Sequence, residues 1–236
     1  MINEKCPLLL RDLFLYDIQA AHPTILKKQF FDFEKTDLDN KTERNIFIGK
    51  KQIDNKNLSG FLQSSVDNLM QFYLMDNDVK EDEIITIQKD GCILRTYLSN
   101  IDQFIELKLR KNIDFLVLSV DRKKFLYCSD GKVTVKGVPY YYEELNKIYQ
   151  MFANLNFYNK SVLFEQLQMI KNLVLESTDK KLFSIPRGEG KFIISTFKGE
   201  IEISDPEFVP IASIDKMKYY KHFIKDFSNS IFLESY

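Results

Sequence analysis

One stretch near the beginning of the chain limits what the rest can fold into. Residues 13–26 read LFLYDIQAAHPTIL: an apolar run of strand-forming residues, one carboxylate at Asp17, and a His-Pro pair before an amphipathic segment. This order predicts a buried strand over residues 12–17, followed by a helix over about residues 23–35 with Pro23 in its first turn. A carboxylate at the end of a buried strand needs a positive partner, which could be a metal, a lysine or backbone amides.

A second carboxylate, Asp90, lies at the tip of a predicted hairpin. Residues 84–97 place Asp90-Gly91 between two runs of strand-forming residues, a strong hairpin pattern. Taken alone, Asp90 could simply serve the turn. Together, the two stretches would place Asp17 and Asp90 on adjacent strands of one sheet, each near a strand end. Two such carboxylates can bind a pair of divalent cations, which is how phosphoryl and nucleotidyl transfer is commonly catalysed.

The composition is that of a globular protein with a sizeable core. The chain has 236 residues and 44% of them are hydrophobic, which is enough for one large domain or two small ones. The net charge of −1 means that nucleic-acid binding would need a local basic face. The three cysteines have no paired spacing and there are two histidines, which argues against a zinc or His-rich centre. We expect an intracellular protein, in the cytoplasm or at a viral replication site, without a membrane span or a signal peptide.

The first half of the chain predicts an α+β sheet with helices on one face. A helix of about five turns is indicated by apolar residues at helical spacing, namely Leu58, Phe61, Leu62, Val66, Leu69, Met70 and Tyr73. A polar segment over residues 36–45 reads as a solvated loop. We also expect a helix from Ser99 or Asn100 to about residue 111, a strand over 115–120 and a hairpin over 125–135.

The second half is predicted to be mostly helical with a small β-hairpin. The expected elements are helices over residues 140–155, 160–176 and 214–231 and a hairpin formed by 191–196 and 200–204. The last helix carries a basic side formed by Lys216, Lys218, Lys221 and Lys225. Such a side is usually a solvated face, but it would contact phosphates if it faced a nucleic-acid groove. The three tyrosines at 140–142 could stack on bases, or be divided between core and surface.

These stretches resemble, in order, the motifs of the family B DNA polymerases. Asp17 and the following residues 20–25 are similar to motif A, an Asp followed by Ser-Leu-Tyr-Pro-Ser-Ile. Residues 87–91 are similar to the motif C tip, Tyr-Gly-Asp-Thr-Asp-Ser, with Asp90 at the second, metal-binding aspartate. Further segments resemble the Lys-rich strand and the KGV segment of the palm and two parts of the thumb, at residues 122–125, 130–138, 186–194 and 214–221.

The resemblance implies an antiparallel polymerase-type palm sheet backed by helices over residues 1–137 and a thumb over 138–236. The fingers would be reduced to about residues 27–57, and the polar segment 36–45, if it is not a loop, would be their tip. Several positions depart from the family pattern. His22 replaces the tyrosine that senses the 2′ position of the sugar, and Gln88 replaces the first motif C aspartate. About thirty residues separate the motif A helix from the palm helix, too few for two long fingers helices. No stretch resembles an exonuclease domain.

For function, the resemblance implies a DNA-directed DNA polymerase that uses Mg²⁺ or Mn²⁺ on a DNA primer–template. Asp17 and Asp90 would be the catalytic metal ligands, the backbone at Ile18 would approach the triphosphate, and His22 would lie under the sugar. Lys51, or less favourably Lys50 or Arg44, would neutralise phosphate charge. The residues expected to contact nucleic acid are Lys124, Lys191, Lys218 and Lys221.

Two other interpretations remain open at this point. The short fingers, Gln88 and the missing fingers motif favour an inactive or partial polymerase-derived subunit that binds nucleic acid or a partner protein of a replication complex. The other is a half-polymerase that needs a separate chain to supply fingers or exonuclease. It is intermediate between the active polymerase and the inactive subunit. Nothing in the residues excludes an unrelated α+β domain. The Asp17 and Asp90 pair favours the enzyme.

Overall fold

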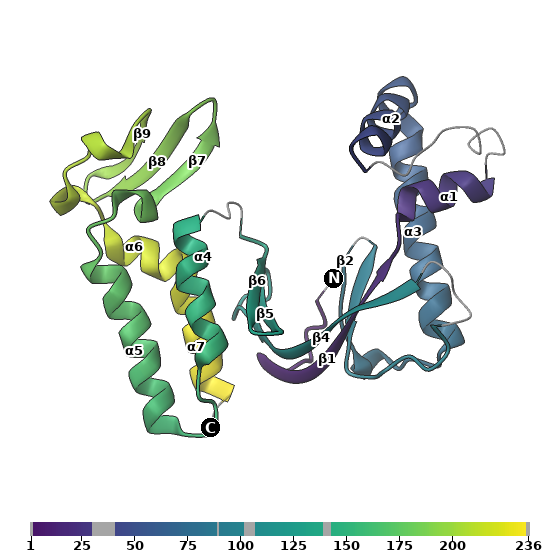
Figure 1. Ribbon diagram of the computed structural model, residues 1–236, viewed down its shortest axis with the longest axis horizontal. Helices are drawn as coiled ribbons and strands as arrows, with labels where there is room; N and C mark the ends of the chain where they lie inside the picture. Colours follow the sequence, from purple (N-terminus) through teal and green to yellow (C-terminus); the bar gives the residue numbers. More distant parts are fainter. Residues whose placement is uncertain (1, 30–40, 89, 102–106, 139–142, 235–236) are drawn as a thin grey trace. The chain divides into compact units, whose positions relative to one another are not determined.

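The protein is an α+β protein with one six-stranded antiparallel sheet and one three-stranded sheet (Figure 1). This computed structural model describes residues 2–29, 41–88, 90–101, 107–138 and 143–234. The strand orders are β2-β3-β1-β4-β5-β6 and β7-β8-β9. The strands of the large sheet are β1 (Leu9–Ile18), β2 (Ile84–Gln88), β3 (Gly91–Leu94), β4 (Leu107–Leu118), β5 (Phe125–Ser129) and β6 (Lys132–Lys136). The predicted α+β class is confirmed.

By its internal packing the chain divides into two units. Unit 1 is Met1–Cys6 with Asp12–Asn112, and unit 2 is Pro7–Arg11 with Ile113–Tyr236. The strands β1 and β4 are long enough to contribute residues to both. Each unit has a hydrophobic core of its own, around Tyr16 in unit 1 and around Tyr149 in unit 2. The predicted division into palm and thumb at residue 137 is a functional boundary that packing does not test, and it stays a prediction.

Unit 1 combines the β2–β3 hairpin with the helices α1 (Ala21–Gln29), α2 (Lys41–Asp54) and α3 (Lys56–Asp76). The three helices pack against one another, as Figure 1 shows. Asn55 caps α3 by accepting a hydrogen bond from the Asn57 amide at 3.1 Å. The side chains that α3 buries recur every three or four residues, as predicted: Leu62, Val66, Met70, Tyr73 and Leu74. Part of the predicted loop, residues 41–45, is helical in α2, whereas 36–40 lie outside the described residues.

The predicted helix over residues 99–111 is wrong where the structure describes it. Its last part belongs to β4, which begins at Leu107 and continues into the strand predicted for 115–120. Burial alternates along the start of this strand, with Leu107 and Ile113 buried and Lys108 and Arg110 exposed. That two-residue period indicates a half-buried strand. It is a stronger indication of secondary structure here than the possible helix cap at Ser99 or Asn100. Residues 102–106 lie outside the described part.

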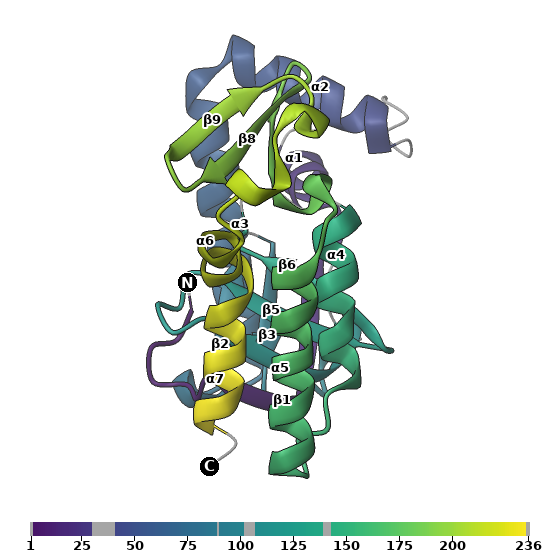
Figure 2. The same ribbon diagram turned by 90° about the vertical axis from the view of Figure 1, so that its left-hand side faces the viewer.

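The described residues of unit 2 contain the β5–β6 hairpin, which is confirmed, and the helices α4 (Glu143–Gln150), α5 (Lys160–Glu176), α6 (Lys216–Tyr220) and α7 (Asp226–Glu234). Figures 1 and 2 show α4, α5 and α7 side by side, with the small sheet beyond one end of them. That sheet consists of β7 (Ser184–Gly188), β8 (Lys191–Thr196) and β9 (Gly199–Ile203). The predicted hairpin is therefore confirmed, and β7 pairs with β8 as a third strand.

Short irregular turns connect these elements. The 3₁₀ turns are Glu81–Glu83, Met151–Asn154, Lys180–Phe183, Pro206–Phe208 and Ile211–Ser213. The predicted final helix is interrupted between α6 and α7 by a π-helical turn, Lys221–Lys225. Among the described helices, none combines the length and the apolar character that crossing a bilayer requires.

Candidate functional site

A cavity of about 530 Å³ lies in unit 1, where β1 leads into α1. Its size is within the range of small-molecule sites. The lining comes from the end of β1, the first turn of α1, one side of α2, the hairpin tip and β4: Asp17, Ile18, Gln19, Ala20, Ala21, His22, Pro23, Ile48, Gly49, Gln52, Asp90 and Arg110. Both predicted carboxylates therefore face one cavity.

The register of the sheet brings the two carboxylates together. Asp17 on β1 lies opposite Gly91 on β3, and the Ile18 amide donates a hydrogen bond to the Asp90 carbonyl at 2.7 Å. This confirms that the strand ending at Asp17 and the hairpin are neighbours. A Cβ at Gly91 would lie 3.1 Å from the Tyr16 carbonyl oxygen and 3.9 Å from Asp17 Oδ1. The absence of a side chain at Gly91 thus leaves the approach to Asp17 open.

The environment of Asp17 disfavours its negative charge. Burial raises the pKa of the Asp17 carboxyl, and the nearby Asp90 carboxylate raises it further. The guanidinium of Arg110 acts in the opposite direction, through its charge and its hydrogen bond. A carboxyl group whose pKa is raised by burial and by a second carboxylate is a common feature of sites that bind a cation or transfer a proton.

Arg110 is a charged residue of this site that was not among the predicted site residues. Its Nε donates a hydrogen bond to Asp17 Oδ2 at 3.1 Å, and both side chains are partly exposed. Arg110 lies on β4, the neighbour of β1 in the sheet, and it was hidden by the wrong prediction of a helix over 99–111. The alternating pattern of residues 107–113 could have revealed it, because it places Arg110 on a strand rather than on a helix.

The oxygen donors of the cavity fit a hard divalent cation. Within the described residues no group of three or more His, Cys, Asp or Glu side chains could hold a metal. Asp17 and Asp90 are therefore the anionic ligands that the cavity offers. Mg²⁺ is usually held by one or two carboxylates and completes its coordination with water and substrate phosphates. The pair is suited to that mode of binding and unsuited to a closed all-protein cage.

The first turn of α1 lines the same cavity. Ala21 and His22 are its first residues, and amides at these positions have no partner within the helix. The Ile18 amide, which was predicted to approach a triphosphate, already donates to the Asp90 carbonyl. Ala20 turns the chain between β1 and α1 in the left-handed region, with φ of 49°. Any anion would therefore meet amides of the helix start sooner than the amide of Ile18.

The predicted phosphate-neutralising lysine is not part of the cavity lining. Helix α2 contributes Ile48, Gly49 and Gln52, while Lys51 is exposed and absent from the lining. The spacing of the three lining residues places one side of α2 toward the cavity, and Lys51 is not on that side. Lys50 is also exposed, and the side chain of Arg44 lies outside the described residues. The role proposed for Lys51 stays a prediction.

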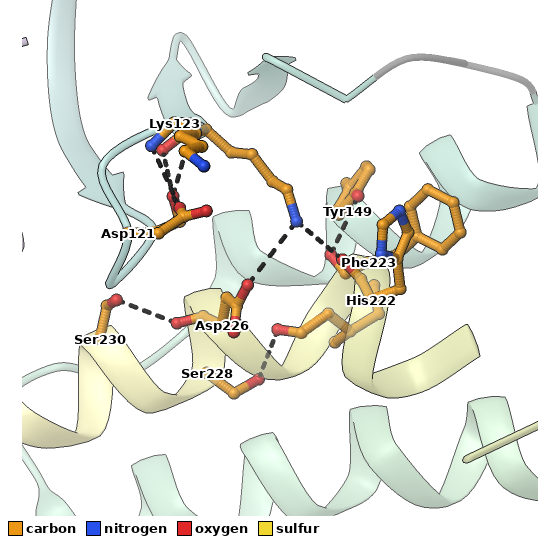
Figure 3. A network of polar contacts seen from close by, with 11 residues as sticks. Asp121, Lys123, Tyr149, His222, Phe223, Asp226, Ser228 and Ser230 are labelled. Carbon is orange, nitrogen blue, oxygen red and sulfur yellow. Dashed lines mark hydrogen bonds and ion pairs between the residues drawn. The ribbon is translucent and has the colours of Figure 1, made fainter. Parts of the chain in front are cut away.

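Lys124 is engaged inside unit 2. Its Nζ donates a hydrogen bond to the His222 carbonyl at 3.0 Å and lies 3.6 Å from Asp226 Oδ2. Figure 3 shows this network around His222 and Asp226, beside Tyr149. The Lys124 side chain is 15% exposed. These contacts attach the segment before β5 to the π turn and to α7. Lys124 would have to break them in order to contact nucleic acid.

The other lysines predicted to contact nucleic acid are on the surface of unit 2. Lys191 pairs with Glu202 at 3.0 Å, and Lys218 pairs with Glu200 at 2.9 Å. Lys221 is exposed. Exposed pairs of this kind contribute little to stability and can exchange partners. The three tyrosines at 140–142 lie outside the described residues.

Comparison with known proteins identifies no relative by sequence. No protein-family model matches the chain, and no curated protein matches it. Among solved structures, the chain is similar to the family B DNA polymerase from the hyperthermophilic archaeon Pyrobaculum calidifontis, with 10% sequence identity and a TM-score of 0.49. The match covers 98% of this chain and 46% of that polymerase, so the chain spans about half its length. A likeness this weak establishes neither a family nor an activity.

Proposed function

We propose that this protein is a nucleotidyltransferase that adds a nucleotide to a primer 3′ end, with divalent cations bound at Asp17 and Asp90. The observation that carries the proposal is the single cavity that both carboxylates line, at the ends of neighbouring strands. The order of polymerase-like motifs along the chain adds support. Bound Mg²⁺ or Mn²⁺ would activate the attacking oxygen and neutralise charge on the phosphates.

The chain's own residues would bind and position the reactants. Asp17 and Asp90 would supply the anionic ligands, and the first-turn amides of α1, with the positive end of its dipole, would orient a phosphate. Arg110, the arginine in the cavity lining, would contribute fixed positive charge. In this chemistry, positioning and charge neutralisation supply most of the rate.

Primer extension tests the proposal directly. With Mg²⁺ or Mn²⁺, the wild-type protein is expected to extend an annealed primer, and Asp90→Asn is expected to reduce the rate by about a hundredfold or more, because it removes one of two anionic ligands. Asp76→Asn is the matched control, since it removes an exposed carboxylate from α3 in the same unit. Equal rates for wild type and Asp90→Asn would refute the assignment of this site.

The alternative is a polymerase-derived subunit without catalysis. Two observations favour it: Asp17 is paired with Arg110, and Gln88 occupies the place of a motif C aspartate. On this view the protein binds nucleic acid, or a partner chain that supplies fingers or exonuclease. Tight primer–template binding without extension under any metal condition would favour this alternative.

His22 is proposed to face the sugar of the bound nucleotide. It lines the cavity at the second position of α1. Imidazole is smaller than a phenol ring and can form a hydrogen bond, so discrimination against ribonucleotides is expected to be weak. His22→Tyr is expected to introduce a preference for deoxyribonucleotides of about tenfold or more, since excluding a group by bulk alone gives about 1–3 kcal/mol. Extension assays with each nucleotide set measure this ratio. Strong wild-type selectivity that the substitution leaves unchanged would show that His22 is not the sugar gate.

A further inference from the structure

The guanidinium of Arg110 uses only part of its hydrogen-bonding capacity. A guanidinium has five N–H donors, and the contact to Asp17 Oδ2 uses Nε. Within the described residues, the structure records no partner for its two terminal nitrogens. The side chain is 41% exposed and lines the cavity, so these donors can be reached by a ligand there.

Arg110 also competes with a metal for Asp17. The carboxylate oxygen that it contacts belongs to one of the two carboxylates that line the cavity. A divalent ion on Asp17 would be repelled by the guanidinium beside it, and the guanidinium would lose its carboxylate partner to the ion. The charge left without a partner would then face the cavity.

The free donors match one class of ligand. Arginine binds phosphate oxygens in a bidentate manner, with stronger hydrogen bonds than those between neutral groups. Among the side chains that line the cavity, Arg110 is the one that always carries a positive charge. Ala21 and His22 in the first turn of α1 line the same cavity, so their amides would be a second kind of donor for an anion there.

We propose that Arg110 exchanges partners when the site is loaded. It neutralises Asp17 in the ligand-free protein, and it binds a phosphate oxygen of a nucleoside triphosphate once a divalent cation has taken Asp17. This inference rests on the proposed function and adds to it a triphosphate-binding residue outside the predicted set. It assigns to β4 the phosphate contact that the sequence analysis placed on Lys51.

The test measures two affinities that should change in opposite directions. Arg110→Met is expected to bind Mn²⁺ about threefold or more tightly in the absence of nucleotide, because an exposed ion pair no longer competes. The same variant is expected to bind a nonhydrolysable α,β-imido deoxynucleoside triphosphate, with Mg²⁺ present, about tenfold or more weakly, because a charge-assisted phosphate contact is lost. Electron paramagnetic resonance of free Mn²⁺ and titration calorimetry provide the two values.

Two controls make the outcome specific. Arg95→Met removes an exposed arginine of the same unit that is outside this cavity lining, and it should change neither affinity. The nucleoside without phosphates should not distinguish Arg110→Met from wild type.

The remaining outcomes separate this inference from the proposed function. If wild type binds Mn²⁺ through Asp17 and Asp90 but Arg110→Met leaves both affinities unchanged, or lowers both, the partner exchange is refuted and the proposed function stands. If wild-type Mn²⁺ binding is absent or insensitive to Asp17→Asn and Asp90→Asn, the proposed function fails and the inference fails with it.

Discussion

Saturating Mn²⁺ is expected to raise the Tm of the wild-type protein by about 5–10 °C and to leave Asp17→Asn and Asp90→Asn unchanged. A ligand that binds only the folded state stabilises it by about 2.7 kcal/mol at a hundred times its dissociation constant. For a chain of this size, 1 kcal/mol corresponds to about 2–4 °C. The physical reason is that two carboxylates share one cavity, and a divalent ion removes their repulsion.

Differential scanning fluorimetry in Mn²⁺ and in Mg²⁺, against the same protein in EDTA, measures this shift. Asp76→Asn controls for the loss of one negative charge in unit 1 and should respond to metal as wild type does. A wild-type Tm that is indifferent to both ions would contradict the proposed metal site.

Without metal, the stability of Asp17→Asn relative to the wild-type protein is expected to increase as the pH rises. Burial and Asp90 raise the pKa of Asp17, so the folded protein holds its proton more tightly than the unfolded chain does. That contribution to stability is present below the ordinary aspartate pKa and is lost as the pH rises through the raised pKa. The Tm of Asp17→Asn in EDTA, relative to wild type, should therefore increase between about pH 3 and about pH 7. A flat difference would show that the carboxylate carries no such penalty.

Tyr149→Ala is expected to reduce the free energy of unfolding by about 3–5 kcal/mol, the usual effect of removing a large aromatic side chain from a core. The Tyr149 ring is fully buried in unit 2 and packs against Phe227, with ring centroids 6.1 Å apart. Its hydroxyl donates a hydrogen bond to the Phe223 carbonyl at 3.1 Å. That carbonyl belongs to the π turn Lys221–Lys225, where the widened backbone changes which amides reach the carbonyls.

Side chains from three segments of the chain donate hydrogen bonds to carbonyls of this turn. Besides the Tyr149 hydroxyl, the donors are Lys124 Nζ to the His222 carbonyl and Ser228 Oγ to the Ile224 carbonyl. Tyr149→Phe should keep the packing and lose only the hydroxyl, at a cost of about 0.5–1.5 kcal/mol, the usual net contribution of one hydrogen bond. Urea unfolding of Tyr149→Ala, Tyr149→Phe and the exposed control Phe208→Ala separates ring from hydroxyl. A Tyr149→Phe variant as stable as wild type would show that the π turn does not depend on this bond.

Local sequence patterns were sufficient for most elements of the fold. The helical spacing along α3, the Asp90-Gly91 and Asp130-Gly131 turns and the apolar run into Asp17 predicted one helix, two hairpins and the first core strand. Each of these is encoded within a few residues, because side-chain period and turn conformation are local properties. That Asp17 lies beside the hairpin strand was predicted from the position of both carboxylates near strand ends, and the register of β1 and β3 confirms it.

Local patterns did not determine which positively charged group lies beside Asp17 in the cavity. Whether Asp17 meets a metal, a lysine or backbone amides was open, and the structure adds Arg110, almost a hundred positions along the chain. Its side chain reaches Asp17 only because β4 pairs with β1, and strand pairing depends on contacts between distant residues. The roles of Lys124 and Lys51 depended on tertiary contacts in the same way. A lysine in a sequence shows that a positive charge exists, but only the folded chain decides which groups that charge meets.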